Sequence, residues 1–541
     1  MSSSIKREQF NIGHLCTRQQ CEAGRGSKVA MRWLSAAMEQ TDLTFTDLEQ
    51  QSNRVANLLV EVGAKAGDIV FTFLPKMPEQ FFILLGILKI QAVAGPLFAN
   101  FGEEGLLDRL GDSQAKILFT RRSFLKKIER IRDRLPALRT IILIDSEADL
   151  ADDLLSYRCL AERASTEYQV EPTAAETPSL LHYTSGSTGK PKGVLHVHRS
   201  ALTQRMTAEK ILQLGSNDVF WCTADQGWVT GTSYGIIGPW SLGVTQIHFG
   251  GGYDATSWFS ILESQAVTVW YTAPTALRML MREDPATLQR TDLSNLKHIF
   301  SVGEPLNPEV IQWSRRVLGK EIYDTWFQTE TGAIMISNRP GVVVKPGSMG
   351  IPVVGVEPAI LREDGSAADE MEQGALCLKA GWPSMFVTYL NHDDSYQQKF
   401  KDGFYYTGDT AYRDKDGYYW FMGRSDDVIN TAGHLVSPFE VESAALEIEE
   451  VAESGAIGVP DELLFEKVVL FVALHKTYTA SLDLELKIRL YIAHRVSSVA
   501  TPQQIFFIDS IPKNKSGKIM RRILKARYLG LDAGDTSTLE A

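Results

Sequence analysis

The stretch YTSGSTGKPKG (183–193) lies between two apolar runs, SLLHYT (179–184) and GVLHVH (193–198). Its glycines let backbone N–H groups turn inward, and its hydroxyl and ammonium groups add donors without negative charge. This composition favours phosphate binding. A Walker loop is excluded, because Pro191 rather than Ser or Thr follows Lys190. A flexible linker is the less favoured alternative, since predicted strands flank the loop on both sides.

The composition limits what else the chain can be. At 541 residues it is too long for one hydrophobic core and predicts at least two domains. A net charge of −11 argues against nucleic-acid binding, which requires surplus Lys and Arg. Five cysteines without a C-x-x-C pair disfavour a disulfide framework or a zinc ribbon, and predict a reducing, cytoplasmic location.

We expect neither a secretory signal nor a membrane span. The start, MSSSIKREQF, lacks the apolar stretch of a secretory signal. The most apolar run, 81–98, is interrupted by Lys89 and Gln91, which leaves it too short to cross a bilayer. It predicts a buried helix that continues into a strand.

The order of predicted elements indicates an α/β protein. Helix patterns alternate with short apolar strands over 45–120, which is typical of a largely parallel sheet, whereas 139–180 predicts one strand followed by a polar surface connection. After Lys345 the pattern shortens and predicts a small β subdomain. The last segment predicts a compact α/β unit that ends in a basic helix at 517–529. We place the boundary after Ser425, giving domains 1–425 and 426–541.

Three polar motifs suit a nucleotide site, although each is weak alone. Asp409 in YTGD can accept both hydroxyls of a ribose. Glu330 in QTETG is a hard oxygen ligand suited to phosphate-bound magnesium. Lys518 lies in a basic terminal segment, which is more often just a solvated helix face.

The histidines near the loop admit two interpretations. His196 and His198 are spaced so that both imidazoles share a strand face, and His182 lies on the preceding run. No third ligand of Cys or acidic type follows nearby, so structural histidines are favoured over a zinc site.

The motifs together are far more specific than any of them alone. In order and spacing they resemble the AMP-forming acyl-CoA synthetases of the adenylate-forming superfamily, and among these the acetate–CoA ligases. The resemblance covers nearly the whole chain. Its motifs are YTSGSTGKPKGVLHVH, WCTADQGWVTGTSYG, YTAPTALRML, SVGEPLNPEV, YDTWFQTETG, YYTGDTAYRDKDGYYWFMGRSDDVI and IPKNKSGKIMRRILK.

The resemblance implies a fold and a two-step reaction. The expected fold has a large N-terminal domain of two α/β lobes and a β subdomain, and a small, mobile α+β C-terminal domain. A carboxylate attacks the α-phosphate of ATP, pyrophosphate leaves, and CoA then attacks the acyl-adenylate and releases AMP. The same path in reverse would make ATP. Donors fixed near the α-phosphate should therefore matter most.

The resemblance also assigns the nucleotide site. Lys518 is implied as the catalytic lysine that bridges carboxylate and α-phosphate, Thr184 and Thr329 act beside it, and Glu330 is the implied Mg²⁺ ligand. Residues of the phosphate loop are Thr184, Ser185, Gly186, Ser187, Thr188, Gly189 and Lys190; those near adenine, ribose and α-phosphate are Gly303, Glu304, Pro305, Asp324, Thr325, Trp326, Phe327, Gln328, Thr329, Asp409 and Arg424.

The acyl and CoA sites are implied in the same way. Asp426 is the implied hinge, about which the C-terminal domain swings between the two half-reactions. The acyl pocket is implied for Val229, Thr230, Val302 and Phe327, and CoA contacts for Ala432, Gly433 and His434.

Four positions depart from the pattern of the family. Phe327 stands where acetate enzymes have a second Trp, so the pocket should stay short but admit slightly more than acetate. Leu435 replaces an arginine that reaches the phosphates, Ala432 a serine near CoA, and Phe465 a glycine. At these positions the resemblance does not assign the contacts with the phosphates and with CoA.

The alternatives concern the acid and the acceptor. A short-chain ligase preferring propionate, or an adenylation module that loads a carrier protein, fits the same motifs, although no carrier domain is fused here. We expect small-molecule substrates (ATP, a short acid and CoA), no nucleic acid or membrane partner, a monomer or homodimer, and possible acetylation of Lys518.

Overall fold

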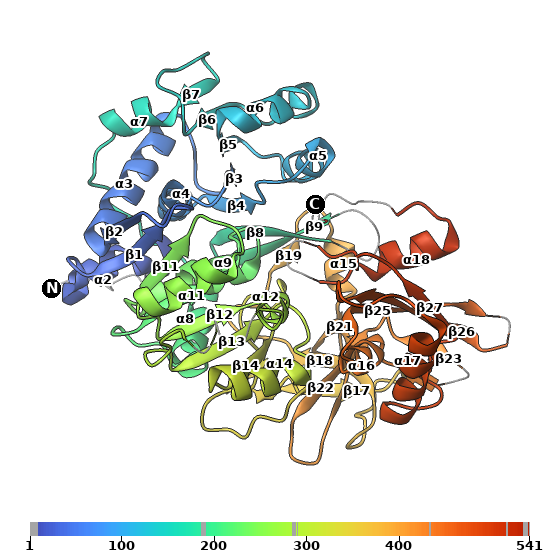
Figure 1. Cartoon of the computed structure of the whole chain (residues 1–541). Coiled ribbons are helices and arrows are strands. Elements are labelled where there is room, and N and C mark those ends of the chain that lie inside the picture. Colours follow the sequence, from blue (N-terminus) through green and yellow to red (C-terminus); the bar gives the residue numbers. More distant parts are fainter. Residues whose placement is uncertain are drawn as a thin grey trace.

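The computed structural model describes residues 9–185, 191–283, 288, 290–431, 434–461, 463–514, 518–533 and 539. Within this part of the chain the strands form four sheets, and the fold class predicted from the sequence is confirmed (Figure 1). No helix within the described ranges is long and apolar enough to cross a membrane.

The first sheet has eight strands in the order β19-β9-β8-β4-β3-β5-β6-β7. Strands β3 to β7 pair in parallel, as the alternation of helices and strands predicts. Strand β8 carries the chain into the phosphate-loop region and pairs with β9 in antiparallel fashion. The strands are β3 (Ile69–Phe73), β4 (Val93–Leu97), β5 (Ile117–Thr120), β6 (Thr140–Leu143), β7 (Leu154–Ser156), β8 (Pro178–Ser185), β9 (Pro191–Val197) and β19 (Thr388–Tyr389).

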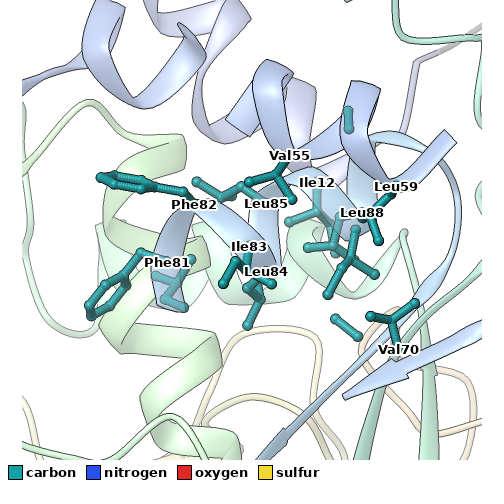
Figure 2. Close-up of a cluster of buried hydrophobic side chains, with 14 of the residues drawn as sticks. Ile12, Val55, Leu59, Val70, Phe81, Phe82, Ile83, Leu84, Leu85 and Leu88 are labelled. Carbon is teal, nitrogen blue, oxygen red and sulfur yellow. The ribbon is translucent and has the colours of Figure 1, made fainter. Parts of the chain in front are cut away.

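Two helices, α3 (Phe45–Glu61) and α4 (Pro78–Lys89), cover this sheet (Figure 2). Helix α3 begins at a capping box, in which Thr44 and Asp47 bond each other's backbone N–H groups. The two helices pack closely at Gly86, where a Cβ atom would lie 2.5 Å from Val55. Helix α4 is buried on nearly all sides, which explains why its sequence is so uniformly apolar.

The second sheet has nine strands in the order β16-β15-β14-β13-β12-β10-β11-β1-β2. Its central strands are parallel, so their carboxyl ends meet at one edge, where ligands of open α/β sheets bind. The strands are β1 (Val29–Leu34), β2 (Gln40–Thr44), β10 (Val219–Cys222), β11 (Thr245–Phe249), β12 (Val269–Thr272), β13 (His298–Val302), β14 (Ile322–Trp326), β15 (Ile336–Ser337) and β16 (Ile351–Pro352).

Helices α1 (Ile12–Cys16) and α2 (Arg18–Gln20) precede the first strand, α15 (Asp393–Gln397) follows β19, and the other helices of this part of the chain connect strands of these two sheets. Besides α3 and α4, the connecting helices are α5 (Glu103–Asp112), α6 (Arg122–Glu129), α7 (Tyr157–Arg163), α8 (Ser200–Lys210), α9 (Val229–Thr232), α10 (Gly238–Ser241), α11 (Ala255–Ser264), α12 (Pro274–Leu280) and α14 (Pro308–Trp313).

The third sheet is the β subdomain predicted after Lys345, and its strand pairs are antiparallel. The fourth sheet belongs to the C-terminal segment, drawn in orange and red in Figure 1. The strands of the third sheet are β17 (Pro358–Leu361), β18 (Gly374–Lys379), β20 (Phe400–Lys401), β21 (Phe404–Arg413) and β22 (Tyr419–Arg424). The fourth has β23 (Ile429–Thr431), β24 (His434–Val436), β25 (Val451–Asp461), β26 (Phe465–Leu474) and β27 (Gln504–Phe507), with helices α16 (Pro438–Leu446), α17 (Leu482–Arg495) and α18 (Arg521–Leu529).

Two local predictions are wrong. The region 139–180 is not only a surface connection, because it adds the edge strand β7 and helix α7, whose Leu160 is fully buried in the first core. The basic helix starts at Arg521 rather than at 517. Lys513 and Ile519 form an isolated β-bridge instead, and Lys518 directly precedes Ile519 of this bridge.

Candidate active site

A cavity opens where the eight-stranded sheet, the nine-stranded sheet, the β subdomain and the C-terminal segment meet. Each of these four regions contributes predicted site residues to its wall. The lining residues that the sequence singled out are Thr184, Val229, Thr230, Val302, Gly303, Glu304, Pro305, Asp324, Thr325, Trp326, Phe327, Gln328, Thr329, Glu330, Asp409, Arg424, Asp426 and Lys518.

Asp409 and Arg424 form the polar centre of the cavity wall. They face each other across β21 and β22, and Arg424 Nη1 lies 3.1 Å from Asp409 Oδ1. Asp409 Oδ2 accepts hydrogen bonds from Trp326 Nε1 at 3.1 Å and from Gln328 Nε2 at 3.0 Å. Burial raises the pKa of Asp409 and the Arg424 guanidinium opposes that shift. The carboxylate is thus held rigidly at the cavity wall.

The segment after β14 is fixed by partners outside its own motif. The Tyr389 hydroxyl donates to Glu330 Oε1 at 2.7 Å, and His196 Nε2 donates to the Thr329 carbonyl at 2.8 Å. Glu330 offers a single carboxylate, and the described residues contain no cluster of three metal-ligating side chains. It therefore fits a Mg²⁺ ion whose other ligands are phosphates and water, as this hard cation prefers.

The loop after β13 is held by an ionic network. Gly303 has φ of +93°, a left-handed conformation that suits glycine. Glu304 Oε2 accepts from Thr275 Oγ1 at 2.9 Å and from Arg278 Nη2 at 2.5 Å. Arg278 also donates to Asn307 Oδ1 at 3.0 Å, so the loop is tied to the start of α14.

Asp324 differs from the other carboxylates of the cavity. It is buried, and burial raises its pKa well above the ordinary range. Its Oδ1 atom has no hydrogen-bond partner among the described residues. A protonated carboxyl at this place can donate a hydrogen bond to a ligand.

The predicted acyl-pocket residues all line the cavity, and Val302 and Phe327 belong to one hydrophobic cluster. Val229 and Thr230 begin α9, Val302 ends β13, and Phe327 follows β14. The Phe327 ring packs edge-on against Tyr234, with ring centroids 5.6 Å apart. Phe327 lines the cavity, and the buried Tyr234 packs behind it and fixes its ring.

Lys518 reaches the cavity from the C-terminal segment. Its backbone N–H donates to Asn514 Oδ1, and its carbonyl accepts from Asn514 N, both at 2.9 Å. Lys518 is still exposed to the open cavity. Desolvation by the cavity walls lowers its pKa, and the Arg424 guanidinium lowers it further. The geometry thus brings the predicted lysine to the side of the predicted ribose pair, from 109 residues away in sequence (518 versus 409).

Several predicted residues are not brought to this cavity or cannot be placed. His434 is exposed in β24 and does not line the cavity, so its role with CoA stays a prediction. Ser185 ends β8. Gly186, Ser187, Thr188, Gly189 and Lys190 of the phosphate loop, and Ala432 and Gly433 of the CoA set, lie outside the described residues.

The three histidines have separate partners, as structural residues do. His182 Nδ1 lies 3.3 Å from the Gly227 carbonyl and its Nε2 2.9 Å from Thr232 Oγ1, whereas His198 Nδ1 accepts from Ile12 N at 3.1 Å. Burial lowers the pKa of His182 to about 3 and that of His196 to about 4, so both are neutral.

Sequence reasoning missed five residues around the cavity. Tyr389 orients Glu330, and Arg278 and Asn307 hold the loop of Glu304. Lys192 and Lys399 add ammonium groups to the wall. Lys192 lies inside the glycine-rich stretch and could have been singled out for its charge. Arg278 and Asn307 lie within the quoted motifs YTAPTALRML and SVGEPLNPEV but were not singled out there. Tyr389 and Lys399 lie in stretches without a distinctive pattern, and only the fold brings them to the cavity.

The comparisons agree with this geometry. The chain matches the family model of the AMP-binding enzyme over residues 17–390, and that of the AMP-binding enzyme C-terminal domain over residues 440–518. The chain therefore belongs to the AMP-binding enzyme family. It is 44% identical over 534 residues to the acetyl-coenzyme A synthetase of Bacillus subtilis, with 98% of this chain and 93% of that protein covered.

Solved structures give the same result. The crystal structure of the Brucella canis acyl-CoA synthetase is 34% identical, with a TM-score of 0.75, covering 96% of this chain and 94% of that one. The anthranilate CoA ligase AuaEII in complex with anthranoyl-AMP is 28% identical, with a TM-score of 0.88, covering 98% and 99%.

Proposed function

We propose that this chain is an AMP-forming acetate–CoA ligase, which converts ATP, acetate and CoA into acetyl-CoA, AMP and diphosphate through an acetyl-adenylate. The observation that carries the proposal is the cavity in which Lys518 meets the Asp409–Arg424 pair and the Thr329–Glu330 segment. The full-length similarity to proteins named acetyl-coenzyme A synthetase supports it.

In the first half-reaction, side chains of the cavity hold the nucleotide and the acid and balance their negative charges. Asp409, fixed by Arg424, accepts the ribose hydroxyls. The Lys518 ammonium draws the acid carboxylate and the α-phosphate together, which lowers the repulsion between two anions. Glu330 would hold Mg²⁺, which when bound neutralises the phosphates. Lys518 and its domain then move away about Asp426, so that the thiol can reach the adenylate.

The division of the chain follows from the same proposal. We place the boundary at 425/426, and the support is that the fourth sheet draws all its strands from residues after that point, starting with β23. Asp426 lies 3.8 Å from Arg424 through its Oδ1 atom, beside the nucleotide wall, as a hinge should. A cytoplasmic location, acetylation of Lys518 and a monomeric or dimeric state remain predictions.

Phe327 sets the length of carboxylic acid that the proposed acyl pocket accepts. A phenyl ring in place of an indole leaves room for about one methylene, which is worth roughly 1–3 kcal/mol of discrimination. Propionate should therefore be used within about an order of magnitude of acetate, and longer acids should fall away. Phe327→Trp should sharpen the preference for acetate, whereas Phe327→Gly should admit longer acids.

The test measures pyrophosphate release with acetate, propionate, butyrate and hexanoate, each with and without CoA, in the wild type and both variants. Pyrophosphate release with acetate, and acetyl-CoA formation once CoA is added, support the proposal. A preference for propionate would favour the short-chain alternative. Adenylation without thioester formation on free CoA would favour the carrier-protein alternative. If both variants keep the wild-type preference among the four acids, Phe327 does not line the acyl pocket.

A further inference from the structure

One ammonium group at the cavity is not explained by any of the motifs. Lys399 lies between α15 and β20 and lines the cavity. Its carbonyl accepts a hydrogen bond from Tyr406 N at 2.7 Å, which fixes its backbone to β21. Its Nζ atom lies 3.6 Å from where a Cβ atom of Gly408 would stand, and so beside the turn that presents Asp409.

The carboxylates near Lys399 already have other partners. Glu330 and Asp409 both act on its charge, together with the cations Arg424 and Lys192. Asp409 is engaged by Arg424, Trp326 and Gln328, and Glu330 by Tyr389. Within the described ranges Lys399 Nζ has neither a hydrogen bond nor an ion pair. A half-buried ammonium without a counter-ion is costly, and a bound anion would remove that cost.

The surroundings indicate which anion this is. Glu330 and Lys192 act on the charge of Lys399, whereas Asp427 and Arg521 act on that of Lys518. Lys192 pairs with Thr184 across β8 and β9, and Glu330 follows Thr329, so Lys399 lies near the segments that carry these two hydroxyls. Both ammonium groups act near Arg424, beside the ribose pair. We propose that Lys399 binds the α-phosphate of the nucleotide, opposite to Lys518; this assignment rests on the proposed function.

The two lysines differ in what holds them. Lys399 belongs to the β subdomain, because β20 pairs with β21, the strand that carries Asp409. It therefore stays with the nucleotide when the C-terminal domain moves. Lys518 neutralises the α-phosphate only in the first half-reaction, whereas Lys399 does so in both.

The experiment compares binding of AMP with binding of adenosine, by titration calorimetry on the full-length protein. Lys399→Gln removes the charge, Lys399→Met is a second uncharged variant, and Lys399→Arg keeps the charge. Lys401→Gln is the matched control, because Lys401 is exposed two residues further along the chain. Loss of a charged hydrogen bond should weaken AMP binding by about 10- to 150-fold in Lys399→Gln and Lys399→Met. Adenosine binding should be unchanged, and Lys399→Arg and Lys401→Gln should stay near wild type.

The outcomes separate the two proposals. Equal AMP affinity in Lys399→Gln and the wild type would overturn the assignment of Lys399 and leave the proposed function standing. Equal loss of AMP and adenosine affinity would overturn it as well, since it would indicate a structural role. Failure of the wild-type protein to bind AMP would overturn the proposed function, and this assignment with it.

Discussion

Replacing Asn307 with Ala should impair adenylation by loosening the C-terminal domain. Asn307 occupies the N-cap position of α14 without a side-chain capping bond, and its Nδ2 atom donates instead to Ser443 Oγ of α16 at 2.8 Å. Its Oδ1 atom accepts from Arg278, which in turn holds Glu304 of the nucleotide loop. The network therefore connects the wall of the nucleotide site to the domain that carries Lys518.

The expected size of the Asn307→Ala effect follows from how deeply Asn307 and Ser443 are buried. Asn307 is 4% exposed and Ser443 9%, so each polar group loses water when the two domains meet. A buried group left without its partner costs about 1–3 kcal/mol. The docked orientation should become less favourable by about 5- to 150-fold relative to other orientations. The rate of acetate-dependent ATP–pyrophosphate exchange should fall by up to that factor.

The assay measures the two half-reactions separately. Thioester formation from supplied acetyl-adenylate should be nearly unchanged, because it does not use the orientation that contains this bond. Ser443→Ala is the matched variant, since it breaks the same bond and leaves Arg278 its partner. A double-mutant cycle should give a coupling energy of about 0.5–3 kcal/mol. Additive effects, or equal loss of both half-reactions, would refute the reasoning.

Two other predictions concern charge. Lys518→Ala should abolish pyrophosphate exchange with acetate but leave thioester formation from acetyl-adenylate largely intact; equal loss of both would contradict a role confined to the first step. Glu49→Ala should lower the free energy of unfolding by about 3–5 kcal/mol, measured in denaturant, because it leaves the buried Lys89 ammonium, now 2.6 Å from Glu49 Oε2, without its counter-ion. Burial alone would raise the pKa of Glu49, but Lys89 lowers it overall, so this stability is present above the ordinary pKa of the carboxyl and lost as the pH falls below it.

The sequence predicted best where a local pattern coincides with a structural element. The apolar run before Thr184 became β8, and SVGEP became a strand that ends in a left-handed glycine at Gly303. Such motifs combine a strand end with a turn, and both are encoded by neighbouring residues. The helix placed at 517–529 failed because a β-bridge between Lys513 and Ile519, closed by Asn514, competes with helix formation up to Met520.

The rest of the site depends on contacts between distant segments. Asn307 and Ser443 are 136 residues apart. Asn307 lies in the motif SVGEPLNPEV, but nothing in the motif predicts that its side chain contacts Ser443. Lys399 lies in an ordinary polar stretch after α15. Phe465, by contrast, was singled out from the sequence, because it stands where the family pattern has a glycine. The structure gives Phe465 a φ of +70°, a backbone conformation that glycine adopts without strain.

The proposed reaction uses the same nucleotide site in both half-reactions, and this accounts for where Lys399 and Lys518 lie. A phosphate monoanion must stay neutralised while the lysine that promotes its first reaction withdraws. A fixed cation on the β subdomain and a second one on the moving domain meet this requirement, whereas two lysines on the moving domain would leave the adenylate with Arg424 alone. Arg424 is already committed to Asp409 at 3.1 Å, so it contributes little net charge. Lys399, whose ammonium has no ion pair among the described residues, meets this requirement under the proposed assignment. The proposal therefore makes Lys399 the stationary counter-ion and Lys518 the mobile counter-ion of the same phosphate.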